Sequence, residues 1–158
     1  MNKIEMRVLN EKIKSNMKYA TDGSAAIDLV ACLDDDDTGN SLRPNGNCIR
    51  PGNSFKCKTG LSIHIADIGM AAIILPRSGM GSKGIVLANT IGLIDSDYQG
   101  EIIVTLKNTN RIDSFIVNDG DRIAQMIFVP ILHPILVEVE EFSTKTNRGD
   151  GGFGSTGR

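Results

Sequence analysis

The side chains best suited to chemistry gather in residues 76–100, which read PRSGMGSKGIVLANTIGLIDSDYQG. Arg77 carries a planar guanidinium, Ser78 carries a hydroxyl, and Gly79 and Gly81 let backbone N–H groups approach a ligand closely. Such a combination of residues favours the binding of an oxyanion such as a phosphate.

The second half of this stretch offers an amide, two carboxylates and a phenol. Asn89 carries both a donor and an acceptor, which suits the polar edge of a nucleobase. Residues 93–100 read as a strand, a polar turn and the start of a returning strand, which predicts a β-hairpin with Asp95 and Tyr98 at its tip. Taken singly, each residue has a plainer explanation: the aspartate as a turn former, Tyr98 as a cross-strand packing residue and Arg77 as a solvated charge.

Taken together, these residues resemble the second and third motifs of the homotrimeric dUTP diphosphatases, the dUTPases. Three further motifs of that family follow its order, at residues 23–29 (GSAAIDL), 120–127 (GDRIAQMI) and 148–157 (RGDGGFGSTG). Five ordered motifs are far more specific than any one of them, and they extend from about residue 20 to the C-terminus.

The resemblance implies that the protein hydrolyses dUTP to dUMP and diphosphate with Mg²⁺, which limits uracil incorporation into DNA and supplies dUMP for thymidylate synthesis. Asp95 is the implied general base, because a positioned carboxylate can orient a water molecule and accept its proton. Asp28 is implied to hold the metal through its water ligands, with Gln125 beside it. The other implied substrate-binding residues are Arg77, Ser78, Gly79, Asn89, Tyr98, Arg148, Phe153, Ser155 and Thr156.

The implied binding roles divide by substrate group. Arg77, Ser78 and Gly79 grip the phosphate chain, while Arg148, Ser155 and Thr156 close over its end. Asn89 reads uracil, Tyr98 lies where a ribose 2′-hydroxyl would collide, and Phe153 stacks on the base.

Alternatives stay open beside this interpretation. Asp28 lies inside an apolar run, and its carboxylate could equally bond nearby backbone amides. A dCTP deaminase would share the barrel and bind a similar nucleotide, although the sequence Asp95-Ser96-Asp97-Tyr98 favours hydrolysis. A non-catalytic protein that responds to dUTP could use the same pocket without turnover.

Composition narrows the remaining classes of function. The 158 residues suit one domain, and 17 basic against 19 acidic residues leave a net charge of −2, which argues against a nucleic-acid partner. Three cysteines without CxxC spacing indicate neither a disulfide framework nor a zinc site, and favour a reducing cytosol. The sequence has no run of eighteen apolar residues, which is the length that would predict a membrane span, so we expect a cytoplasmic protein.

Period-two alternation and turn signals every ten or so residues predict an all-β fold. Alternation places strands at Ile4 to Val8, at Leu61 to Ile65 and at Ile102 to Leu106, and we expect a last strand over 131–142. The resemblance implies a jelly-roll-like β-barrel over 1–142. Residues 34–52 have the polar, Gly- and Pro-bearing composition of a surface loop, and their four adjacent aspartates are expected to be solvated.

Residues 143–158 differ in kind from the rest. From Arg148 onward, five glycines and a single apolar side chain among eleven residues cannot form a core, so we expect a flexible tail. By resemblance, this tail is a lid that orders on ligand. Because eleven extended residues span roughly 36 Å, the lid could reach a neighbouring subunit of a homotrimer with shared sites.

Overall fold

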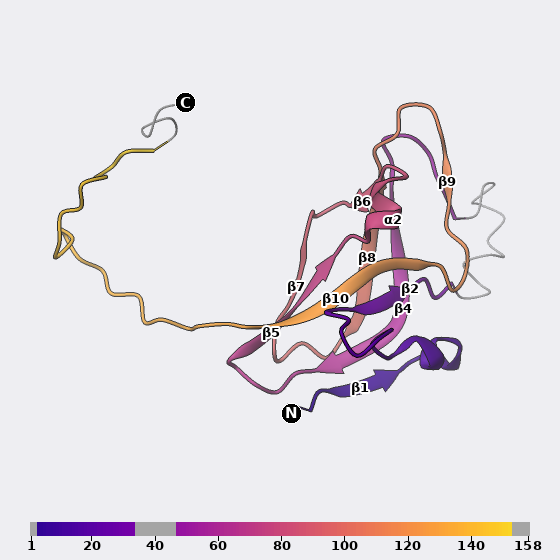
Figure 1. Ribbon diagram of the computed structural model, residues 1–158, viewed down its shortest axis with the longest axis horizontal. Coiled ribbons are helices and arrows are strands. Elements are labelled where there is room, and N and C mark those ends of the chain that lie inside the picture. Colours follow the sequence, from indigo (N-terminus) through magenta and orange to yellow (C-terminus); the bar gives the residue numbers. More distant parts are fainter. Residues whose placement is uncertain (1–2, 34–46, 153–158) are drawn as a thin grey trace.

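The computed structural model describes residues 3–33 and 47–152 (Figure 1). Over these ranges the chain is built of β-strands with one 3-10 helix and one short α-helix, which confirms the all-β prediction. The elements are β1 (Glu5–Val8), η1 (Glu11–Asn16), β2 (Ile27–Val30), β3 (Cys48–Ile49), β4 (Ser54–His64), β5 (Met70–Leu75), α2 (Ser78–Gly81), β6 (Ile85–Leu87), β7 (Gly92–Ile94), β8 (Glu101–Asn108), β9 (Phe115–Ile116) and β10 (Arg122–Pro130).

Two four-stranded antiparallel sheets enclose one hydrophobic core. Their strand orders are β1-β4-β8-β6 and β2-β10-β5-β7, and β3 with β9 forms a small separate pair. The predicted alternation is confirmed in β8, where Ile102, Val104 and Leu106 are buried while Ile103 between them is half exposed. Because successive side chains of a strand point to opposite faces, one face of each sheet supplies the core.

The predicted hairpin at residues 93–100 is wrong. Ile94 of β7 pairs with Ala72 of β5, whereas Glu101 of β8 pairs with Ser62 of β4 in the other sheet. The turn itself is present, because the Tyr98 N–H donates to the Asp95 carbonyl at 3.2 Å. Residues 95–100 therefore form a corner that carries the chain from one sheet to the other.

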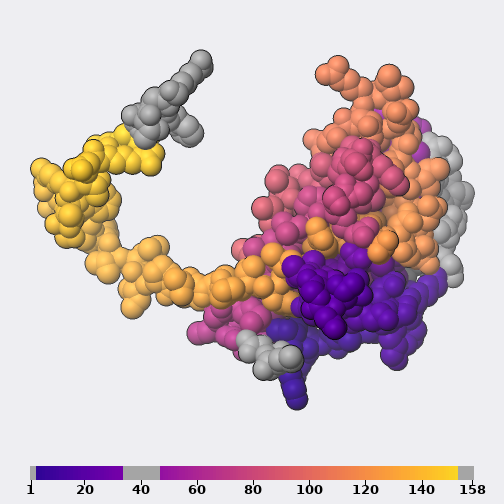
Figure 2. Space-filling model, in the orientation of Figure 1, coloured from indigo at the N-terminus to yellow at the C-terminus, as the bar shows by residue number. Residues whose placement is uncertain are grey.

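The predicted last strand over 131–142 is absent. The strand β10 ends at Pro130, and residues 131–152, here called the arm, contain neither helix nor strand and extend away from the barrel (Figures 1 and 2). Pro130 and Pro134 cannot donate backbone hydrogen bonds, and a strand needs a neighbour to pair with. The large apolar side chains that the arm exposes are Leu132, Ile135, Leu136, Val137, Val139 and Phe142.

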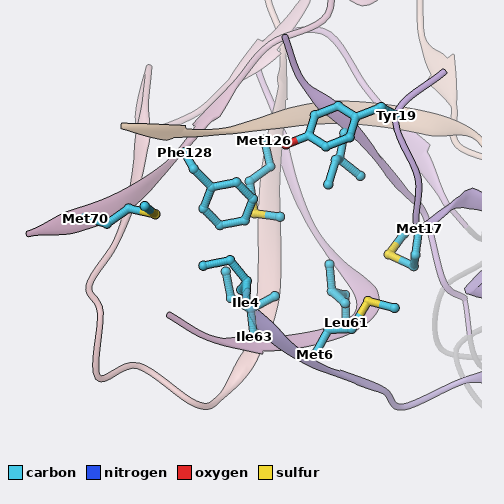
Figure 3. Close-up of a pocket in the computed structure, with 10 residues that line it drawn as sticks. Ile4, Met6, Met17, Tyr19, Leu61, Ile63, Met70, Met126 and Phe128 are labelled. Atoms are coloured by element: carbon cyan, nitrogen blue, oxygen red, sulfur yellow. The ribbon is translucent and has the colours of Figure 1, made fainter. Parts of the chain in front are cut away.

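An apolar groove of about 310 Å³ opens between the strand β1 and the β2 and β10 side of the barrel (Figure 3). Methionine and aromatic side chains dominate its walls, which are formed by Ile4, Met6, Met17, Tyr19, Ile27, Leu61, Ile63, Met70, Met126 and Phe128. The flexible thioethers of methionine suit a surface that adapts to another apolar surface.

Three further expectations concern the surface loop, the cysteines and membrane-spanning helices. Most of the predicted surface loop, with its four aspartates, lies outside the described residues. None of the three cysteines, all of which lie in the described residues, forms a disulfide. No helix within residues 3–33 and 47–152 is both long and apolar enough to cross a membrane.

Candidate active site

Three adjacent strands bring the predicted phosphate and metal residues to one end of a sheet. Gln125 of β10 lies opposite Asp28 of β2 on one side and opposite Leu75 of β5 on the other. Pro76 and Arg77 continue directly from Leu75, and the Gln125 side-chain amide donates to the Pro76 carbonyl at 3.0 Å. Asp28, Gln125 and Arg77 are therefore neighbours, as the resemblance implies.

The carboxylate of Asp28 lies between two guanidiniums. Arg77 Nε is 2.7 Å from Asp28 Oδ1, and Arg122 Nη1 is 3.3 Å from Asp28 Oδ2. The Asp28 and Arg77 side chains are each about three-quarters buried, so the pair removes the cost of placing an unpaired carboxylate inside an apolar run. Arg122 is a functional candidate that sequence reasoning missed, because 94 positions separate it from Asp28.

Ser78 and Gly79 lie in the single turn of the short helix α2. Arg77 is its extended N-terminal neighbour, and Met80 is buried and anchors the turn in the core. An added Cβ at Gly79 or at Gly81 would meet nothing within 4 Å. The backbone at these two positions is therefore uncrowded and open to a ligand.

A polar clamp fixes the chain just after α2. The Asn110 side-chain amide donates to the Lys83 carbonyl at 2.8 Å, and the Thr109 N–H and hydroxyl both donate to the Gly84 carbonyl at 2.8 Å. Gly84 has φ +72°, and the Asn110 amide lies 2.7–2.9 Å from where a Cβ would stand. Only glycine satisfies both the left-handed backbone and this close approach.

A second group of predicted site residues lies on the corner between the sheets. Asp95 is exposed and lines a cavity together with Ile68, Ile131 and His133. The Tyr98 hydroxyl donates to the Glu101 carbonyl at 2.9 Å. Asn89 is exposed in the turn between β6 and β7, six positions before Asp95.

The register of β5 and β7 separates Asp95 from Arg77. Ile94 lies opposite Ala72, so Asp95 continues toward the Met70 end of β5, whereas Arg77 follows its other end. Six residues of extended chain at about 3.4 Å each place the backbone positions of the two residues roughly 20 Å apart. The structure brings Arg77 to Asp28 and Gln125, but it does not bring Asp95 to them.

The tail residues are only partly described. Arg148 lies in the arm, where its Nε donates to the Gly151 carbonyl at 2.9 Å. The predicted site residues Phe153, Ser155 and Thr156 lie outside the described residues. Among residues 3–33 and 47–152, no group of three or more His, Cys, Asp or Glu side chains is placed to hold a metal ion without other ligands.

Comparison with known proteins identifies the class. The sequence pattern of the dUTPase family matches residues 14–157. This chain belongs to the dUTPase family. It is 47% identical over 162 residues to the deoxyuridine 5′-triphosphate nucleotidohydrolase of Shigella flexneri serotype 5b (strain 8401), covering 100% of this chain and 99% of that protein. The enzyme of the same name from Klebsiella pneumoniae (strain 342) is 48% identical with the same coverage.

Solved structures support the fold. The dUTPase of Staphylococcus bacteriophage 80alpha with dUPNHPP superposes with a TM-score of 0.75 at 23% identity, and the match covers both chains completely. A mutant dUTPase from phage phi11 of S. aureus, described for its coordination of a structural Mg(II) ion, gives a TM-score of 0.71 at 23% identity over 90% of this chain and all of that one. The predicted family and the jelly-roll-like fold are both confirmed.

Proposed function

We propose that this protein hydrolyses dUTP to dUMP and diphosphate. Its relatives of 47% and 48% identity, matched over their whole length, are nucleotidohydrolases of deoxyuridine triphosphate. The observation that carries the proposal is the cluster of Asp28, Arg77 and Gln125 beside a turn whose glycine backbone is open to a ligand. Such a cluster provides a guanidinium cation and hydrogen-bond donors for a triphosphate chain.

In this proposal Arg77, Ser78 and Gly79 bind the phosphate chain. The Arg77 guanidinium has five N–H donors, so its bond to Asp28 leaves donors for phosphate oxygens. Arg122 holds the second oxygen of Asp28 and keeps the carboxylate in place while Arg77 serves the substrate. The clamp at Lys83 and Gly84 keeps the turn from shifting as charge develops.

The chemistry of the cluster fits a hydrated Mg²⁺ that arrives with the nucleotide. Each oxygen of Asp28 accepts one bond from an arginine, which leaves lone pairs for water ligands of a metal. Asp28 and Gln125 would hold such an ion through those waters, because Mg²⁺ dehydrates reluctantly. When bound, Mg²⁺ neutralises charge on the triphosphate and thereby eases attack on phosphorus.

Asp95 is the proposed general base, which orients the attacking water and accepts its proton. Asn89 reads the polar edge of uracil from the turn between β6 and β7. Tyr98 lies against the sugar on the corner and excludes a ribose 2′-hydroxyl. All three side chains are exposed in the single chain, which leaves them accessible to a nucleotide.

Association of three copies would complete the site. A general base must reach its water directly, so Asp95 cannot serve a phosphate held by Arg77 at roughly 20 Å. A second copy that contributes its own Asp95 corner beside the Arg77 cluster resolves this separation. The number three follows the homotrimeric members of the family.

Two uncovered apolar surfaces support this association. The arm exposes six large apolar side chains, of which Leu132, Ile135 and Leu136 are at least 90% exposed. The groove beside β1 is open within the described part of the chain, where Met6 and Tyr19 on its rim are about half exposed (Figure 3). An arrangement in which the arm of one copy lies in the groove of the next would remove both surfaces from water.

The tail and the location complete the proposal. Arg148, Phe153, Ser155 and Thr156 would close over the nucleotide, with the phenyl ring stacked on uracil. We place the protein in the cytoplasm, since three cysteines without a disulfide suit a reducing compartment. There its product dUMP would serve thymidylate synthesis, and removal of dUTP would limit uracil in DNA.

One assay tests the proposal against its rivals. Purified protein is incubated with dUTP, dCTP, dTTP and UTP, each with Mg²⁺ or with a chelator, while diphosphate and ammonia are measured. We expect diphosphate release from dUTP alone at a substantial rate, and a large loss of that rate with the chelator. Ammonia from dCTP would establish a deaminase instead, and dUTP binding without any product would establish a binding protein.

A further inference from the structure

The ring of Tyr98 occupies the space beside Gly100. A Cβ placed ideally on Gly100 would lie 2.5 Å from the Tyr98 hydroxyl oxygen and 2.7 Å from Cζ. Real Cβ atoms do not approach other atoms so closely, whereas an ordinary contact begins near 3.4 Å. The side chain of Tyr98 can therefore fold back over the corner only because residue 100 has no side chain.

A hydrogen bond from its own hydroxyl keeps the ring in this folded position. The Tyr98 hydroxyl donates to the Glu101 carbonyl at 2.9 Å, and this bond passes over Gly100. The Tyr98 side chain is otherwise accessible, since the residue is 41% exposed. A modest steric push can therefore move the ring outward into solvent.

The backbone on both sides of Gly100 is fixed. The Gln99 carbonyl accepts a bond of 2.5 Å from the hydroxyl of Ser62, a buried residue of β4. On the other side, Glu101 pairs with Ser62 in the sheet, and its carboxylate accepts from the Gly60 N–H at 2.9 Å. A clash at position 100 is therefore relieved by the ring and not by the backbone.

We propose that Gly100 is a positioning residue that sets the choice between deoxyribose and ribose nucleotides by allowing Tyr98 to lie over the corner. This inference rests on the proposed role of Tyr98 in excluding the 2′-hydroxyl. An alanine at position 100 needs 3.4 Å where the ring leaves 2.5 Å, so the ring must move by about 0.9 Å. A displacement near 1 Å at a reacting site costs up to roughly a hundredfold in rate.

Alanine is a fair probe at this position. Gly100 is not among the residues with positive φ, so alanine adopts its backbone conformation without strain. Gly23 is a matched control, because a Cβ there would meet nothing within 4 Å. Thermal unfolding of both variants checks that the fold is kept.

The first measurement is the ratio of kcat/KM for dUTP to kcat/KM for UTP. We expect Gly100→Ala to lower this ratio at least tenfold and Tyr98→Ala to lower it similarly, while Gly23→Ala leaves it unchanged. The double variant Tyr98→Ala with Gly100→Ala should be no less selective than Tyr98→Ala alone, because the two changes act through one ring. Tyr98→Phe keeps the ring but loses its bond to Glu101, and should lower the ratio by a smaller factor.

The second measurement follows the ring without catalysis. The chain has two tyrosines and no tryptophan. After Tyr19→Phe, Tyr98 is the one remaining tyrosine, so the tyrosine fluorescence reports on its ring alone. In that background, Gly100→Ala should increase the quenching of tyrosine fluorescence by iodide, because the ring moves into solvent. Gly23→Ala should not.

The outcomes separate this inference from the function on which it rests. If Tyr98→Ala lowers the ratio while Gly100→Ala leaves both ratio and quenching at the original values, Gly100 does not position the ring. If Gly100→Ala moves the ring but keeps the ratio, the position of the ring does not set selectivity. If Tyr98→Ala itself leaves the ratio unchanged, the sugar-reading role of Tyr98 fails and the inference fails with it. Should Gly100→Ala unfold, Tyr98→Phe decides in its place, and an unchanged ratio there overturns the inference.

Discussion

Mixing two inactive variants tests whether one active site draws on two copies of the chain. In the first variant Asp95→Ala removes the proposed base, and in the second Arg77→Ala removes a proposed phosphate ligand. Each variant alone should lose on the order of a hundredfold or more in turnover. The strands β5 and β7 place the two residues roughly 20 Å apart in one chain, far beyond the reach of a base through one water.

If the base and the cluster come from neighbouring copies, some mixed assemblies regain intact sites. After both variants are unfolded together and refolded in equal amounts, a site needs its Asp95 from one variant and its Arg77 from the other. Random assembly into a closed ring makes this one half times one half, or about a quarter of all sites. At a three-to-one mixture the expected fraction falls to about one fifth, so turnover should follow a shallow maximum at equal amounts.

The assay is diphosphate release from dUTP over a series of mixing ratios. A mixture of Asp95→Ala with Asp95→Asn is the matched control, because no assembly of these two contains a base. Recovery near a quarter of the original turnover in the first mixture, with none in the control, is the expected result. If the first mixture stays as inactive as its parents after the copies have re-associated, base and cluster belong to one chain and the distance argument is wrong.

Three further predictions follow from single contacts. Asp95→Asn should bind dUTP with little change by calorimetry yet lose about a hundredfold in kcat, because an amide orients water without accepting its proton; unchanged kcat would remove Asp95 from its role. Asn108→Ala should lower the free energy of unfolding in urea by about 2 kcal/mol, since the buried Asn108 amide donates to the buried Ile49 carbonyl and to the exposed residue Asp113, and the first of these partners is left unsatisfied; a loss below 1 kcal/mol would contradict this reasoning. Gly84→Ala should raise KM for dUTP by disturbing the turn after α2. Adding Asn110→Ala should bring KM part of the way back, because it removes the clash with the new Cβ but not the strain of the left-handed backbone. Equal KM values for the single and double variants would show that the clash is unimportant.

Alternation predicted which side chains point inward, because a half-buried strand has period two whatever strand it pairs with. It could not predict the pairing itself. Ile94 pairs with Ala72 and Glu101 with Ser62, and these choices depend on contacts far apart in the sequence. Turn chemistry therefore located the corner at 95–100 correctly but suggested the wrong partner strands.

In the candidate site too, local sequence predicts the residue types, whereas strand pairing decides which of them meet. Motifs indicated the residue types at Asp28, Arg77 and Asp95, and the strands around Gln125 bring the first two together. Nothing local to the motifs indicates that Arg122 bonds Asp28 or that Asp95 faces the opposite end of β5. Both facts follow from strand register, which is a property of the folded sheet.

The exposed arm also bears on how the protein is made in the cell. The arm follows the barrel in the sequence, so it leaves the ribosome after the strands that precede it, and the proposed partner copy can cover it only after that. Until then, apolar side chains such as Leu136 and Phe142 stay exposed to water, where they can make unwanted contacts or bind chaperones. Synthesis of several copies on one messenger RNA would shorten the time for which the arm is exposed, because it raises the local concentration of the proposed partner copies. If copies associate as proposed, the amount of active protein in a cell therefore depends on its rate of assembly as well as on its rate of translation.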